Sequence, residues 1–241
     1  MRLPQIQGVI RRRMLVNFRV DPEVIQRQLP ARFRPKLHNG SAIAGICLIR
    51  LEQIRPAGMP SFLGLSSENA AHRIAVIWEE EKGSMQEGVF ITRRDTSSRL
   101  NHFAGGRLFP GEHHQASFQV GTSQDRIEFE MRSKDSEVAI KLRAKISTKL
   151  PASSKFGTLV EASGFFEPGS LGYSVTSDRN RLDGLMLKTK TWQVEPLEVE
   201  EVYSSYFSDE TRFPKRSISF DCALLMRNIE HEWHSAPDLY V

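Results

Sequence analysis

The chain has 241 residues, of which 39% are hydrophobic and 26% are charged, and its formal net charge is +4 at pH 7. This composition is typical of a globular protein with one large core, and it excludes the concentrated basic surface of a dedicated nucleic-acid-binding protein. The first residues lack the continuous apolar core of a secretion signal, and no apolar run is long enough to cross a bilayer, so we expect one cytoplasmic domain over residues 1–241 without a membrane partner.

The first predicted strand covers Gly8 to Val20 and contains three consecutive arginines. Because side chains alternate along a strand, Arg11 and Arg13 should face one side and Arg12 the other, so the three cannot form one flat patch. They are interpreted either as a solvated edge or as a source of one arginine that enters a ligand cavity. Asp21-Pro22-Glu23 then predicts a short helix with Asp21 as its N-cap.

The next segments predict a turn, a buried strand and a long loop. Asn39-Gly40 is a strong tight-turn signal, and the apolar run from Ala42 to Leu51 follows it. Residues 55–69 are rich in proline, glycine and serine and predict an ordered loop, of a length that is often functional. Glu68 and Asn69 end this loop just before a predicted strand at residues 73–78, so they are either binding groups or turn caps.

Residues 88–118 predict a strand, a charged corner, a short helix and a return strand. The strand centres on residues 89–91, and Arg93, Arg94 and Asp95 form the corner. In the helix, an apolar stripe at helical spacing includes Leu100, Phe103, Ala104 and Leu108. Arg107 falls inside this stripe, so its guanidinium must point inward or extend out at the helix end.

The remaining segments predict a largely antiparallel sheet. Alternating strands are expected at residues 115–120, 126–132 and 137–146, with a turn at Lys134-Asp135-Ser136. A polar connector at residues 150–158 precedes a loop and a helical turn at residues 165–181. Three further strands are expected near residues 185–194, 199–203 and 218–225. The fold class is therefore α+β, mainly antiparallel β, with a few short helices.

Familiar catalytic and metal-binding patterns are absent from the sequence. His113 and His114 are adjacent in a strand and should face opposite sides, and His231 and His234 have no convincing third ligand. There is no G-x-S-x-G elbow, P-loop or G-x-G-x-x-G motif. Cys47 and Cys222 are most simply small buried hydrophobic residues. We therefore expect no metal and no cofactor.

Several segments carry a resemblance to a known family, and they occur in that family's order. They are the Leu-Pro-ended helix in DPEVIQRQLPARFRP, the loop ending in Ser67-Glu68-Asn69, the stretch GVFITRRDTSSRLNHFAGGRL, and TSDRNRL followed by TWQVEPLEVEE. The chain resembles the acetoacetate-decarboxylase-like superfamily and, within it, the family known as domain of unknown function 2071. The resemblance implies a closed or cone-shaped antiparallel β-barrel that holds a small carboxylate-bearing molecule. On the more distant likeness to the decarboxylase itself, Arg11 falls at an arginine of the active site.

The sequence departs from the decarboxylase where its lysines are expected. The family pattern places adjacent lysines soon after the strand at residues 89–91, but here Ser98, Arg99, Leu100 and Asn101 follow, and residues 83–133 contain no lysine. Schiff-base chemistry needs a neutral amine, and an arginine cannot replace it because its guanidinium stays protonated. We therefore expect the covalent decarboxylase mechanism to be lost.

The function predicted first is the binding of a small anionic ligand, a carboxylate or keto acid, in the cavity of the barrel. The predicted ligand-binding residues are Arg11, Glu68, Asn69, Arg93, Arg94, His102 and Arg107. An equal contender is that these arginines pair structurally with Asp95, Glu112 or Glu128. Two other functions stay open: an enzyme that uses Glu68 or His102 as a general acid or base, and an oligomeric structural or interaction module. A homo-oligomer is compatible with each of them.

Overall fold

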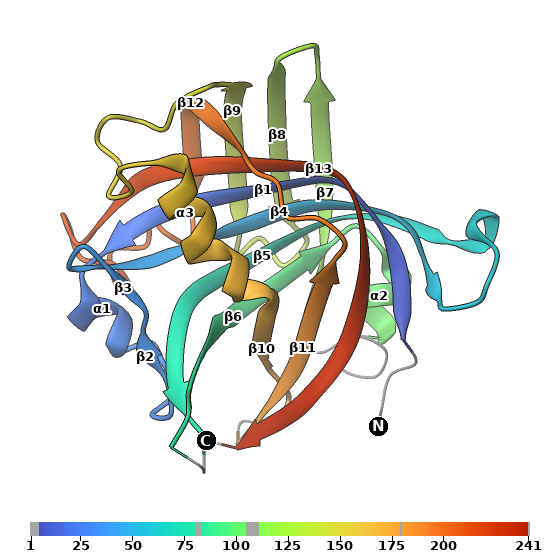
Figure 1. The fold of residues 1–241 in the computed structure, drawn as a ribbon, viewed down its shortest axis with the longest axis horizontal. Helices are drawn as coiled ribbons and strands as arrows, with labels where there is room; N and C mark the ends of the chain where they lie inside the picture. The colour runs from blue at the N-terminus through green and yellow to red at the C-terminus, as the bar shows by residue number, and fades with distance from the viewer. Residues whose placement is uncertain (1–4, 81–82, 105–110, 179, 241) are drawn as a thin grey trace.

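The computed structural model describes residues 5–80, 83–104, 111–178 and 180–240 (Figure 1). The described strands are β1 (Ile6–Val20), β2 (Arg34–Pro35), β3 (Leu37–His38), β4 (Ser41–Pro56), β5 (Leu65–Glu79), β6 (Met85–Thr96), β7 (His113–Thr122), β8 (Arg126–Ser133), β9 (Ala139–Ile146), β10 (Leu171–Val175), β11 (Arg181–Thr189), β12 (Glu195–Ser204) and β13 (Ile218–Tyr240). The helices are α1 (Pro22–Gln26), α2 (Arg99–Ala104) and α3 (Leu159–Phe166), with 3-10 turns η1 (Ser61–Leu63) and η2 (Glu167–Ser170). None of the helices in these ranges is long and apolar enough to cross a membrane.

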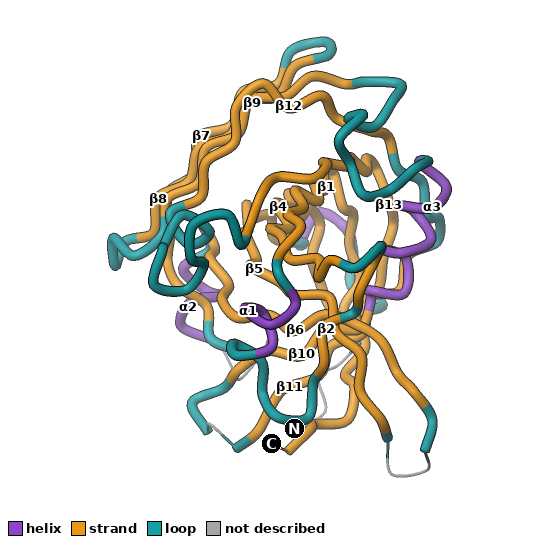
Figure 2. Tube along the Cα trace, turned by 90° about the vertical axis from the view of Figure 1, so that its left-hand side faces the viewer, coloured by secondary structure: helices purple, strands orange, loops and turns teal. Residues whose placement is uncertain are grey.

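The described strands form one 13-stranded sheet whose hydrogen-bonded path closes into two rings. The first ring runs β1-β4-β5-β6-β7-β8-β9-β12-β13 and back to β1. The second ring shares β13, β1, β4, β5 and β6 but is completed by β10 and β11. Figure 2 shows β7, β8, β9 and β12 as an arc on one side, with β10 and β11 below. Within the described residues, the pairings of β6 with β7 and with β10 are parallel and the others are antiparallel, which confirms the mainly antiparallel fold.

Two early sequence predictions are confirmed by the backbone. Asn39 and Gly40 have φ angles of 44° and 76°, the left-handed conformation that a two-residue hairpin turn requires between β3 and β4. Asp21 caps α1, because its Oδ1 accepts a hydrogen bond from the backbone N–H of Glu23 at 2.8 Å. These local signals needed no tertiary information.

The two faces of the shared strands pack into two hydrophobic cores. The core enclosed by the first ring includes Met14 and Val16 of β1 together with Phe129 and Leu142 of β8 and β9. The opposite face packs residues such as Leu15 against α3, which lies across the sheet in Figure 1. Alternate residues of one strand therefore belong to different cores, as expected for a strand that is buried on both faces.

Four predicted elements differ from the structure. The loop expected at residues 55–69 is shorter than predicted and covers residues 57–64, because β4 continues to Pro56 and β5 begins at Leu65. The charged corner at Arg93 to Asp95 lies inside β6, and β13 extends to Tyr240, so His231 and His234 lie on a strand. Helix α3 begins at Leu159, where a polar connector was expected up to residue 158 and a helical turn only from residue 165. Continuous pairing with neighbouring strands outweighs the local turn propensity of these segments.

His72 is a buried ionisable residue in the first core. Its ring packs against Tyr206 and Phe207, with ring centroids 4.5 and 5.7 Å away, and neither ring nitrogen has a hydrogen-bond partner among the described residues. Burial, and then the charges of Arg93 and Arg212, lower the pKa of His72 from 6.5 to about 3. The ring is therefore neutral in the folded protein at neutral pH.

We expect this histidine to make the protein sensitive to acid. Its folded-state pKa lies below the unfolded value of 6.5, so the unfolded chain binds the proton first as the pH falls. The contribution of His72 to the free energy of unfolding is unchanged above pH 6.5 and falls progressively down to about pH 3. At pH 5 the loss from His72 is about 2 kcal/mol. Urea unfolding at pH 7 and pH 5 measures the fall in the free energy of unfolding between the two pH values. In a His72→Phe variant this fall should be smaller than in the unchanged protein by about that amount. Equal losses in the variant and the unchanged protein would contradict the prediction.

Candidate functional site

A cavity of about 290 Å³ lies within the second ring. Its lining residues come from all seven strands of that ring and also from α2, β7 and η2. The volume is at the lower end of the range for small-ligand pockets, about 300–1,000 Å³. The cavity is therefore of a size for a small molecule.

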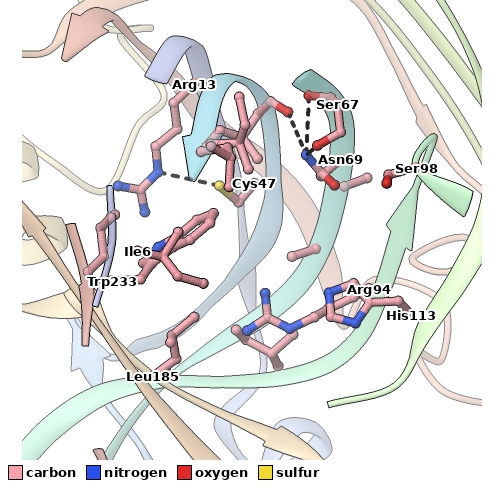
Figure 3. A pocket seen from close by; sticks show the side chains of 18 of the residues that line it. Ile6, Arg13, Cys47, Ser67, Asn69, Arg94, Ser98, His113, Leu185 and Trp233 are labelled. Atoms are coloured by element: carbon pink, nitrogen blue, oxygen red, sulfur yellow. Dashed lines mark hydrogen bonds between the residues drawn. The ribbon is translucent and has the colours of Figure 1, made fainter. Parts of the chain in front are cut away.

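The wall of the cavity is mainly apolar, with a few polar side chains on it. The apolar part includes Ile6, Ile49, Leu51, Ile91, Leu185, Leu187 and Trp233. The polar part includes Arg13, Cys47, Ser67, Asn69, Arg73, Arg94, Ser98 and His113. Figure 3 shows Arg13 and Trp233 on one side of the cavity, and Arg94 and His113 on the other. An apolar wall with a few placed polar groups is typical of a ligand site.

Three arginines on this wall have no carboxylate partner among the described residues. Arg13 is 7% exposed, and its hydrogen bonds go to sulfur: Nε lies 3.4 Å from Cys47 Sγ, and Nη1 lies 4.0 Å from Met226 Sδ. Arg73 is 5% exposed and donates from Nη2 to Asn17 Oδ1 at 2.6 Å, while its Nε has no partner. Each guanidinium therefore keeps donors that the described protein groups do not fully use.

Arg94 completes this group from the other side of the cavity. Its Nε donates to Ser174 Oγ at 3.1 Å, which is its one described hydrogen bond. Burial lowers the pKa of both Arg73 and Arg94 from 12.5 to about 10, so both stay protonated at neutral pH. A buried charge without a counter-charge costs several kcal/mol, and an anion in the cavity would offset that cost. The electrostatics of the cavity thus favour a negatively charged ligand.

Two β-bulges turn Arg13 and Arg94 toward the cavity. In β1, Arg11 is an extra residue between Ile10 and Arg12, which pair with consecutive residues of β4. In β6, Thr92 is an extra residue, since Ile91 and Arg93 pair with Arg73 and His72 of β5. A bulge reverses the alternation of side chains beyond it, so Arg13 and Arg94 reach the cavity side of their strands.

The neutral polar groups are held in place beside the arginines. Asn69 donates to Ser67 Oγ at 2.9 Å and accepts from Thr96 Oγ1 at 2.8 Å, so its amide has one orientation. Burial, and then the charge of Arg94, lower the pKa of His113 to about 3. The imidazole of His113 is therefore neutral at physiological pH, and the one carboxylate on the described wall, that of Asp95, is paired with Arg93 rather than with the cavity arginines.

The structure separates the predicted ligand-binding residues into two groups. Arg94 and Asn69 line the cavity. Arg11 does not, because it is exposed at the bulge and contacts Glu52 at 2.9 Å and Asn228 at 2.8 Å. Glu68 faces the other side of β5, where it pairs with Arg12 at 2.7 Å. Asn69 and Glu68 were expected to orient one ligand together, but adjacent residues in a strand face opposite sides.

Arg93 is a structural residue rather than part of the cavity wall. Its guanidinium contacts Asp95 at 2.9 Å, Asp135 at 2.7 Å and Glu137 at 2.6 Å, so it follows the predicted alternative of ion pairing. His102 is exposed on α2, and its Nδ1 donates to the carbonyl of His113 at 2.6 Å. Neither residue lines the cavity, and Arg107 lies outside the described residues.

Several cavity residues were not among the predicted ligand-binding residues. Arg73 and Cys47 lie in apolar strands and line the cavity. In the sequence, the only feature that could have marked Arg73 as a binding residue was its isolated charge in an apolar strand. Arg13 belongs to the predicted arginine run, which was interpreted either as a solvated edge or as the source of one cavity arginine, and alternation grouped it with Arg11. Trp233 comes from the part of β13 beyond the predicted strand. Finding these residues required the strand pairing and the bulges.

The comparisons with known proteins agree with this fold. Residues 9–219 match the sequence profile of DUF2071, which is described as an uncharacterized conserved protein. No curated protein matches the chain significantly.

Several solved structures share the fold. The acetoacetate decarboxylase of Legionella pneumophila has a TM-score of 0.59 at 11% identity, covering 98% of this chain and 88% of that one. An acetoacetate decarboxylase-like enzyme from Sphingomonas wittichii RW1 has a TM-score of 0.57 at 11% identity, with 98% and 92% covered. The enduracididine biosynthesis enzyme MppR, complexed with pyruvate, has a TM-score of 0.58 at 9% identity, with 98% and 89% covered. At these identities the likeness concerns the fold alone.

Proposed function

This chain belongs to the DUF2071 family, and we propose that it binds a small organic anion, a carboxylate or keto acid, in the cavity of its second ring. The observation that carries the proposal is a group of three arginines without carboxylate partners among the described residues: the buried Arg13 and Arg73 and the partly buried Arg94. Guanidinium groups bind carboxylates through strong charge-assisted hydrogen bonds. We infer that the second ring acts as a small closed barrel around this ligand.

The arrangement of the wall indicates how such an anion is held. Arg13 provides donors at one side, while Arg94, the amide of Asn69 and the hydroxyl of Ser98 provide polar groups at the other (Figure 3). Arg73 also lines the cavity, close enough to Arg13 for the two charges to interact. The apolar side chains between them suit a short hydrocarbon part. A ligand with one acidic end, or with two, fits this pattern. Pyruvate is present in one structure of similar fold, which is compatible with an acid of this size.

We propose that binding proceeds without a Schiff base. No lysine is found among the described residues that line the cavity, and residues 83–133 of the sequence contain none. A covalent imine needs an amine that is neutral near pH 7, and guanidinium groups with pKa values of about 10 do not provide one. The two enzymatic candidates named from the sequence, Glu68 and His102, lie outside the cavity wall.

Calorimetric titration with butyrate, glutarate and acetoacetate tests the binding of acids. Butyramide and glutaramide are the matched controls, because they have the same carbon chain without the negative charge. We expect heat of binding from at least one acid and none from the amides. Folded protein that binds no member of the acid series would overturn the proposal. An Arg11→Met variant should bind like the unchanged protein, since Arg11 lies outside the cavity.

Reductive trapping tests the absence of covalent chemistry. The protein is incubated with acetoacetate and sodium borohydride, and its intact mass is measured. We expect no adduct, because the reaction requires a neutral lysine at the bound ligand. A reduced adduct mapped to one lysine would show that imine chemistry persists in this chain.

A further inference from the structure

A thiol lies between two of the cavity arginines. Cys47 of β4 lines the cavity, and its Sγ accepts a hydrogen bond from Arg13 Nε at 3.4 Å. Cys47 pairs with Leu15 of β1 and with Ala71 of β5. Arg13 lies two residues before Leu15 and Arg73 two residues after Ala71, so both are diagonal neighbours of Cys47 on the same face. Diagonal neighbours in a sheet lie about 7–8 Å apart, within reach of long side chains.

An independent observation indicates that a ligand belongs beside this sulfur. Arg73 is 5% exposed, lines the cavity, and has a buried Nε without a hydrogen-bond partner among the described residues. Arg13 has only sulfur atoms as described hydrogen-bond partners. Both arginines are therefore short of an acceptor at the place where Cys47 reaches the cavity.

The second cysteine provides an internal comparison. Cys222 is fully buried, does not line the cavity, and its Sγ contacts Asn17 Nδ2 at 3.7 Å. Burial raises the pKa of the Cys222 thiol to about 12. A thiol reacts as the thiolate, so Cys222 is inert in the folded protein.

We propose that Cys47 is a nucleophile selective for small acids with an electrophilic carbon near the carboxylate, above all α,β-unsaturated carboxylates. The inference rests on the proposed anion site, because Arg13 and Arg73 hold the carboxylate beside the sulfur. The thiol releases its proton to solvent, and the thiolate forms a C–S bond to the β-carbon. The electron pair of the C=C bond moves to the α-carbon, which takes a proton from water. The net change is the addition of S–H across the double bond, with no oxidant or reductant.

Two alkylating reagents that differ in charge test the selectivity. Iodoacetate and iodoacetamide have the same leaving group and nearly the same size, and both form a C–S bond as iodide leaves. We expect iodoacetate to label Cys47 faster than iodoacetamide by roughly tenfold or more, which corresponds to one charge-assisted hydrogen bond. Neither reagent should label Cys222 in the folded protein. Labelling is followed by peptide mass mapping, and incubation with fumarate should add the whole mass of that acid to Cys47.

Three outcomes decide the inference. An Arg13→Met variant should lose the preference for iodoacetate. In the unchanged protein, glutarate should protect Cys47 from labelling, and this measurement does not depend on whether the variant folds. If the acids bind but iodoacetate shows no preference for Cys47, the inference is overturned while the proposed function stands. If no acid binds in the calorimeter and no preference is seen, both fail.

Discussion

An Arg94→Met variant is expected to bind small acids roughly 10- to 100-fold more weakly, because a hydrogen bond to a charged group contributes about 1.5–3 kcal/mol. It is also expected to melt at a higher temperature without ligand. Arg94 is partly buried on the cavity wall, has Ser174 as its described partner and contacts no carboxylate among the described residues. Replacing an uncompensated, partly buried charge by an apolar side chain of similar length removes a desolvation penalty.

Opposite changes in affinity and stability distinguish a ligand-binding arginine from a structural one. Titration calorimetry measures the affinity for the acid that the unchanged protein binds best, and thermal unfolding measures stability. Arg11→Met is the matched control, because Arg11 is an exposed arginine that contacts Glu52 and Asn228. Its affinity should stay within about twofold of the unchanged protein, because Arg11 does not line the cavity. Its stability should change little as well, since a surface ion pair contributes about 0–1 kcal/mol. Unchanged affinity in Arg94→Met would contradict our assignment of the cavity.

An Asp95→Ala variant is expected to lose about 3 kcal/mol of stability, at the lower end of the range for breaking a buried ion pair. Asp95 is fully buried and accepts hydrogen bonds from Arg93 Nη2 at 2.9 Å and Nε at 3.1 Å. Burial raises the pKa of Asp95, and the hydrogen bonds and charge of Arg93 oppose that shift. Without this carboxylate, Arg93 keeps Asp135 and Glu137 as partners, which limits the loss.

Thermal unfolding measures this effect as a fall in melting temperature of roughly 6–12 °C for a chain of this size. Glu137→Ala is the matched control in the same network. The side chain of Glu137 is 69% exposed, so the loss of its contact with Arg93 should cost at most about 1 kcal/mol. Equal losses in the two variants would show that burial does not determine the strength of this network.

Much of the fold is predictable because its signals are local. The cap at Asp21 and the turn at Asn39-Gly40 depend on residues a few positions apart, and both are confirmed. Alternation predicted the strands that became β8 and β9, whose core sides carry residues such as Phe129 and Leu142. The family is shown by the match over residues 9–219, as the resemblance of several segments had indicated.

The candidate site was predicted only in part, because a sequence pattern does not show where a strand contains an extra residue. Strict alternation groups Arg11 with Arg13, and Ile91 with Arg93. The bulges at Arg11 and Thr92 reverse both groupings, so that Arg13 and Arg94 reach the cavity while Arg93 enters an ion-pair network. A bulge is set by the pairing of neighbouring strands, which are distant in sequence.

The sequence alone therefore determined the strand content, the turns and caps, the family likeness and the absence of lysine from residues 83–133. The closure of the sheet into two rings, and the choice of arginines that face the second ring, depended on tertiary structure. The physical reason is that both follow from hydrogen bonds between strands far apart in the chain, such as β1 with β13 and β6 with β10. Side-chain direction then depends on register, and one extra residue in a strand reverses it.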